Sequence, residues 1–138
     1  MGSEIYVMCR NCGYEKRFIL GIGMLYSSLE EVIDLVHYRR RKKILDILRN
    51  HKVIKDEYRW DNPFYEHRLY RCFNCNRLYG KFYVKIEYDD NKVYETKFKC
   101  SKCKNELKAV EDEKNVKKYP CPECNKKEFS IQEMGLWD

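Results

Sequence analysis

The eight cysteines of this 138-residue chain are its most chemically informative residues. All of them belong to four Cys-x-x-Cys pairs, here called knuckles 1 to 4: Cys9/Cys12, Cys72/Cys75, Cys100/Cys103 and Cys121/Cys124. Two intervening residues let one tight turn point both sulfurs at a single ion, and a tetrahedral zinc ion takes about four such ligands. Each knuckle is therefore half of a metal site, and the set predicts two structural zinc ions per chain.

The spacing of the knuckles indicates which of them share an ion. Between Cys103 and Cys121 lie 17 residues, within the range typical of zinc ribbons. This favours one site made of Cys100, Cys103, Cys121 and Cys124, which leaves Cys9, Cys12, Cys72 and Cys75 for the other. The long chain between knuckles 1 and 2 is then an insertion. Spacing alone does not exclude a second arrangement, in which knuckles 2 and 3 pair across a hairpin and the two terminal knuckles pair with each other.

Two other uses of paired cysteines are disfavoured. Redox-active dithiols of the thioredoxin type lie at the start of a helix after a buried strand, and none of the four knuckles has that context. Iron of the rubredoxin type fits the same tetrahedral sulfur geometry, but zinc is favoured over it. The sequence shows no signal peptide and no apolar stretch long enough to span a bilayer, so we expect reduced cysteines in a soluble, cytoplasmic protein.

The rest of the chain predicts a small α+β fold in which short antiparallel strands carry the knuckles. Alternating apolar residues indicate strands at 14–20, a β-hairpin at 81–99, and two short ribbon strands at 107–110 and 129–131. An aromatic stretch from Tyr58 to Tyr65 is expected to be a packed connector. We expect one compact unit with an N-terminal knuckle module at 1–99 and a C-terminal zinc ribbon at 100–138. Met1, Gly2 and Ser3 receive no structural role.

A helix is predicted at about 28–50, inserted between knuckles 1 and 2. Ser27 and Ser28 are each followed three residues later by an acid, the pattern of a capping box. An apolar stripe at helical spacing follows and resumes at Ile44 after the basic run His37 to Lys43. A continuous helix would place Arg40 and Lys43 on the line of the stripe, so either the helix breaks there or its middle leaves the core.

Several motifs together resemble a family of small bacterial double zinc-ribbon proteins with no established activity. They are the Cys-x-x-Cys-Gly-Tyr sequence ending at Tyr14, the segment Leu20-Gly21-Ile22-Gly23-Met24-Leu25-Tyr26, the three later knuckles, and the final Trp137-Asp138. The resemblance implies a double zinc-binding scaffold with a helical insertion. It implies no activity.

The charge distribution suggests two functions. The chain has a net charge of +6, and the segment His37 to Lys52, with seven basic residues and one acidic residue, carries the same net charge. The first hypothesis is a non-catalytic adaptor or protein-interaction module. The alternative is a nucleic-acid-binding protein whose phosphate contacts are Arg39, Arg40, Arg41, Lys42 and Lys43. An enzyme is not expected, because four-cysteine sites leave no position open for water, and His37, His51 and His67 lack metal-binding spacing.

Overall fold

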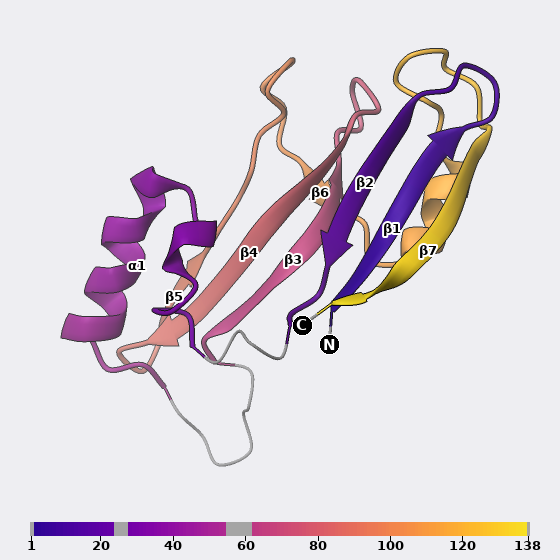
Figure 1. Ribbon diagram of the computed structural model, residues 1–138. Helices are drawn as coiled ribbons and strands as arrows, with labels where there is room; N and C mark the ends of the chain where they lie inside the picture. Colours follow the sequence, from indigo (N-terminus) through magenta and orange to yellow (C-terminus); the bar gives the residue numbers. More distant parts are fainter. Residues whose placement is uncertain (1, 24–27, 55–61, 138) are drawn as a thin grey trace. The chain divides into compact units, whose positions relative to one another are not determined.

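The computed structural model describes residues 2–23, 28–54 and 62–137, and it has the expected small α+β architecture (Figure 1). The strands are β1 (Gly2–Cys9), β2 (Glu15–Leu20), β3 (Phe64–Arg71), β4 (Leu78–Tyr88), β5 (Lys92–Glu95), β6 (Lys108–Ala109) and β7 (Phe129–Trp137). The helices are α1 (Tyr38–Asn50) and the 3-10 helices η1 (Ile33–Leu35) and η2 (Glu113–Lys118). In the ranges described, no helix has both the length and the apolarity needed to cross a membrane.

The chain divides into two units that are discontinuous in sequence. The metal unit comprises Met1–Gly23, His67–Lys81 and Lys97–Asp138, and the helical unit comprises Met24–Glu66 and Phe82–Thr96. The predicted division at residues 99 and 100 is therefore wrong. It assumed that knuckles adjacent in sequence pair, whereas the metal unit is assembled from three separate segments that contain all four knuckles.

The metal unit contains a three-stranded antiparallel sheet of order β2-β1-β7, with η2 packed against β7 (Figure 1). The central strand β1 was not predicted, although its alternation is clear, because Ile5, Val7 and Cys9 are fully buried and the residues between them are not. The two ends of the chain lie together: Gly2 pairs with Trp137, whose indole N–H donates to the Ser3 carbonyl at 3.0 Å.

Two predicted features of the strands need correction. Phe64 and Tyr65 of the aromatic connector belong to a strand, since β3 starts at Phe64 and lies between β4 and β6 in a sheet of order β5-β4-β3-β6. The C-terminal ribbon strands do not pair with each other, because β6 pairs with β3 while β7 pairs with β1. The predicted hairpin is confirmed as β4 and β5, joined by a turn in which Asp89 and Asp90 adopt positive φ.

The inserted helix is shorter than predicted, because it breaks before Tyr38. Arg41 stabilises the break: its guanidinium donates to the Val36 carbonyl at 2.8 Å and to the Asp34 carbonyl at 2.9 Å, which are left without helical partners. The break changes the phase of the helix, so that Ile44 and Ile47 are fully buried against the apolar face of β4. Of the two predicted capping boxes, that of Ser27 lies outside the described residues. Ser28 accepts a hydrogen bond from the Glu31 N–H at 3.2 Å, in a turn.

Candidate metal centres

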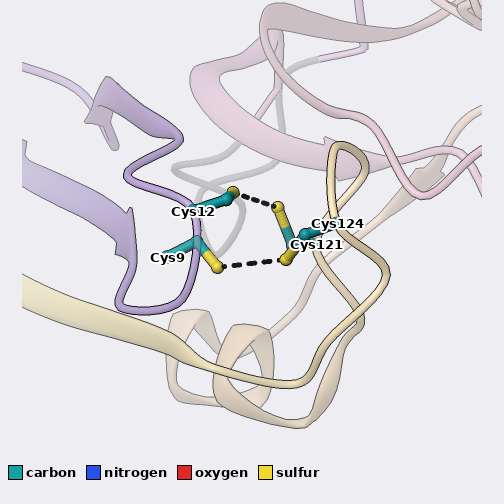
Figure 2. A group of neighbouring side chains, drawn as sticks. All are labelled: Cys9, Cys12, Cys121 and Cys124. Carbon is teal, nitrogen blue, oxygen red and sulfur yellow. Dashed lines mark hydrogen bonds between the residues drawn. The ribbon is translucent and has the colours of Figure 1, made fainter.

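The structure brings the eight cysteines into two groups of four, with a pairing opposite to the favoured prediction. Within each group the sulfur atoms all lie within 4.8 Å of one another. The outer site joins knuckles 1 and 4 and consists of Cys9, Cys12, Cys121 and Cys124 (Figure 2). The inner site joins knuckles 2 and 3 and consists of Cys72, Cys75, Cys100 and Cys103. All eight predicted ligands therefore fall into these two groups, and the arrangement left open by spacing is the one adopted.

The pairing of β1 with β7 explains why the outer site forms across the whole chain. Cys9 is opposite Phe129 in the register, and the Arg10 N–H donates to the Glu128 carbonyl at 2.9 Å. These contacts bring knuckle 4, which precedes β7, to knuckle 1, which begins at the last residue of β1. The Cys12 and Cys121 sulfurs lie 3.6 Å apart although 109 positions separate them in sequence. Sequence spacing could not reveal this contact, because it depends on strand pairing between the two ends.

All four knuckles share one local geometry. In each, the backbone N–H of the first cysteine donates to the carbonyl five residues later, at 2.7 to 2.9 Å. The residue four positions after that cysteine has positive φ and donates its N–H to the cysteine carbonyl, at 2.8 to 3.0 Å. The positive-φ residues are Gly13, Asn76, Lys104 and Asn125. Glycine and asparagine tolerate this conformation well, so the sequence indicated three of the four turns.

Lys104 is the exception in this series. Its φ is +65°, close to that of Asn76 and Asn125, although a lysine side chain is strained in the left-handed region. Its ammonium group donates to the Ser101 carbonyl at 3.0 Å, within the same turn. Knuckle 3 therefore adopts the common geometry despite its residue type, which indicates that the geometry is imposed by the site rather than by local preference.

The inner site is the more enclosed of the two. Cys72 and Cys100 are fully buried, and Cys75 and Cys103 are half-buried, whereas Cys12 of the outer site is exposed. The Tyr79 hydroxyl lies 3.1 Å from the Cys100 sulfur and 3.1 Å from the Ser101 hydroxyl. A hydroxyl donating to a thiolate orients the ligand and stabilises its charge, as groups around metal ligands commonly do.

Backbone N–H groups and burial act in opposite directions on the thiols. A hydrogen bond from the Lys126 N–H lowers the pKa of Cys124 to about 6, and the Asn105 N–H is the main cause that lowers the pKa of Cys103. Burial raises the pKa of Cys75 to about 11. Without a cation, four thiolates at such short distances repel one another. A divalent ion in each group would remove that repulsion and complete the deprotonation.

The donor set of each group fits a tetrahedral metal ion. Four sulfurs within mutual contact distance, on turns whose N–H groups point at them, are the arrangement of structural zinc sites. With four protein ligands, a tetrahedral ion has no position left for water or substrate. The geometry therefore supports metal binding that holds strands together.

The predicted phosphate contacts lie at the start of α1, in the helical unit. Arg41 is bound to the carbonyls at the helix break and forms an ion pair with Asp34 at 3.7 Å. Arg39 donates to the Tyr38 hydroxyl at 3.2 Å, and Lys42 and Lys43 are exposed. Arg40 is partly exposed. At least one member of the predicted set is therefore used to stabilise the fold.

Sequence reasoning missed a second concentration of charge, around the inner site. The segments 67–81 and 97–108 meet there and together contain nine Lys or Arg residues and one acid, a net charge of +8. The corresponding segments of the outer site, 2–20 and 117–137, contain seven basic and five acidic residues, a net charge of +2. Because acidic segments elsewhere cancel the sum, this charge is apparent only once knuckles 2 and 3 are known to pair.

Comparison of the chain with protein-family models, with curated proteins and with solved structures gave no match. The resemblance to small bacterial double zinc-ribbon proteins therefore stays a prediction.

Proposed function

We propose that this chain is a zinc-stabilised, non-catalytic nucleic-acid-binding module whose contact surface surrounds the inner site. The observation that carries the proposal is the net charge of +8 on the two segments that form this site. A zinc ion with four thiolates has a net charge of −2, so the loaded inner site remains strongly positive. Clustered lysine and arginine side chains bind the phosphate backbone and release its counterions.

The basic residues of the inner site are also available for an external partner. Six of them are at least partly exposed and form no ion pair with any residue in the described ranges: Arg77, Lys81, Lys99, Lys102, Lys104 and Lys108. The ion pairs seen between described residues lie instead in the helical unit, where Arg41 and Arg49 contact Asp34 and Glu30. This difference favours the inner site over the start of α1 as the phosphate-binding surface.

Aromatic rings alternate with cations on this surface. The Lys16 ammonium lies 5.2 Å from the centre of the Tyr79 ring, and the Lys81 ammonium lies 5.5 Å from the same ring and 5.9 Å from that of Phe98. The pKa of Lys16 is lowered, first by burial and then by the positive charges of Arg77 and Lys81. Uncompensated cations beside aromatic rings are the combination that single-stranded nucleic acids bind, through phosphates and bases respectively.

The metal and the absence of catalysis are part of the same proposal. Zinc is favoured over iron because eight thiolates in closed tetrahedral sets need no redox function to explain them. Metal analysis should find two zinc ions per chain, and a red protein with sulfur-to-iron charge-transfer absorption would instead identify iron. Saturated coordination at both sites supports a structural role rather than hydrolysis.

An adaptor function is the second candidate, and exposed apolar side chains on the sheet of the metal unit favour it. Ile19 is 44% exposed and Leu136 is 71% exposed. The register places Ile19 opposite Glu4 and Leu136 opposite Ser3, and consecutive residues of β1 face opposite sides of the sheet. These two side chains therefore do not form one patch. The charged surface of the inner site is a better defined contact surface than these separate apolar side chains.

The test compares two variants that remove equal charge from different places. The inner-site variant replaces four lysines with glutamine: Lys81, Lys99, Lys102 and Lys108. The helical-unit variant replaces four basic residues with glutamine: Arg39, Lys42, Lys43 and Lys52. Both variants have the same net charge. Binding of fluorescent single-stranded and duplex oligonucleotides is measured by anisotropy across a salt series.

We expect the inner-site variant to lose affinity and to reduce the slope of log K against log salt by up to about 3, since each phosphate contact contributes about 0.7 on a single strand. The helical-unit variant should bind almost as the parent does. Equal losses in both variants, or a loss confined to the helical-unit variant, would place the surface elsewhere. No binding by the parent at low salt would refute the proposed function.

A further inference from the structure

The most unusual part of the inner-site surface is the side chain of Phe73, which lies in knuckle 2 between the two cysteines. It is 57% exposed, although it is a large apolar ring. The Arg71 guanidinium lies 4.5 Å from the centre of this ring, and the Lys108 ammonium lies 5.7 Å from it. Both cations are close enough for a cation–π attraction to this exposed ring.

Arg71 is the buried cation in contact with this ring. It is only 7% exposed and is held between two rings, because its guanidinium also lies 4.2 Å from the centre of Tyr119. Its terminal nitrogen donates to the Asn76 side chain at 2.7 Å, which fixes it to the positive-φ residue of knuckle 2. Its Nε is buried and has no hydrogen-bond partner among the described residues. Because Arg71 is buried, it cannot cover the exposed part of Phe73.

Arg71 and Lys108 lie on the same face of the sheet. They are directly opposite each other in the antiparallel pair of β3 and β6, and opposed residues project to the same side. Lys108 is exposed and forms no ion pair with a described residue. The ring therefore has one buried, fixed cation 4.5 Å from its centre and a second, exposed cation 5.7 Å from its centre.

We infer that Phe73 is a stacking platform for one unpaired base, with Lys108 binding an adjacent phosphate, so that the chain prefers single-stranded nucleic acid to duplex. The inference rests on the proposed function and specifies its substrate class. Every base has a face that can stack on an aromatic ring, whereas bases in a duplex are already stacked on each other. The charge of Arg71 beneath the ring adds attraction that does not depend on base identity.

The test uses the zinc-loaded full chain, a labelled single-stranded oligonucleotide of mixed sequence and the duplex of the same sequence. Phe73→Ala removes the ring, Phe73→Leu keeps an apolar side chain without a π face, and Phe73→Trp restores and enlarges the platform. Val93→Ala is the matched control, because Val93 is also 57% exposed but lies in the helical unit. Lys108→Gln tests the phosphate contact. Each variant is first checked for two bound ions.

Stacking on an aromatic ring contributes enough that its loss should weaken single-strand binding roughly 5- to 150-fold in Phe73→Ala. Phe73→Leu should lose nearly as much, while Phe73→Trp should bind at least as tightly as the parent. Duplex binding should change little in all three. The salt slope should be unchanged by Phe73→Ala, which removes no charge, and reduced by about 0.7 in Lys108→Gln.

Two results would overturn the inference while leaving the proposed function intact. In the first, Phe73→Ala binds the single strand as tightly as Val93→Ala does. In the second, Phe73→Ala weakens duplex and single strand equally. If the parent chain binds neither oligonucleotide at low salt, the proposed function fails and the inference fails with it.

Discussion

The pairing of the knuckles makes a prediction that can be tested by counting the metal ions bound to cysteine variants. Three double variants are needed: Cys12→Ser with Cys124→Ser, Cys75→Ser with Cys103→Ser, and Cys12→Ser with Cys75→Ser. The first two each remove two ligands from one site and leave the other complete. The third removes one ligand from each site. We therefore expect one tightly bound ion per chain in the first two variants, and none in the third.

The structure also predicts a difference in stability between the first two variants. The outer site links sulfurs that are 109 and 115 positions apart, whereas the inner site links sulfurs that are 31 and 25 positions apart. Closing a longer loop restricts the unfolded chain more, in proportion to the logarithm of its length. The ratio of 109 to 31 corresponds to about 1 kcal/mol. If the sites bind zinc equally well, loss of the outer site should lower the melting temperature by about 4 °C more than loss of the inner site.

Native mass spectrometry counts the ions in each variant, and thermal unfolding in a zinc-containing buffer measures the stability. The double variants differ from one another only in which cysteines are replaced, so each serves as a control for the others. The pairing would be refuted if the variant with Cys12→Ser and Cys75→Ser kept one ion while the variant with Cys12→Ser and Cys124→Ser kept none. That result would restore the sequential pairing of knuckles 1 and 2.

Three further predictions follow from individual residues. Lys104→Gly removes the strain of a lysine held at positive φ and should raise the free energy of unfolding by up to about 1 kcal/mol. Denaturant titration measures this change, and the control Lys102→Gly should not stabilise the chain. A chelator should remove two ions in two phases, the ion of the outer site first, because Cys12 is exposed while no cysteine of the inner site is. The variant that lacks the outer site should show the slow phase alone. Arg41→Ala leaves two carbonyls at the helix break without their charged donor and should lower the stability of the helical unit by about 2 kcal/mol. The loss should be seen as faster hydrogen exchange in α1. A loss of stability no larger than that of Lys42→Ala would contradict this role.

The sequence by itself determined the metal ligands and the shape of each knuckle. These features are local: the hydrogen bonds that build a knuckle span five residues or fewer, and Gly13, Asn76 and Asn125 have the residue types that the left-handed turn position prefers. The β4–β5 hairpin was predictable for the same reason, since its two strands alternate on either side of a short polar turn.

Only the tertiary structure decided which knuckles meet. The spacing between Cys103 and Cys121 suits a ribbon, but β1 pairs along its whole length with β7, and that pairing fixes knuckle 4 beside knuckle 1. Contacts between the two ends of a chain leave no periodic or spacing signal in one sequence. Trp137 shows this well, because its hydrogen bond to Ser3 depends on the register between the first and last strands.

The location of the densest positive charge was decided at the same level. The run from Arg39 to Lys43 is conspicuous in the sequence because its charges are consecutive, yet Arg41 is used within the fold. The charges around the inner site are spread over two segments and come together only because the fold brings knuckles 2 and 3 into one group. Composition gives the sum of the charges, but electrostatic attraction depends on the distances between them, and the fold sets those distances.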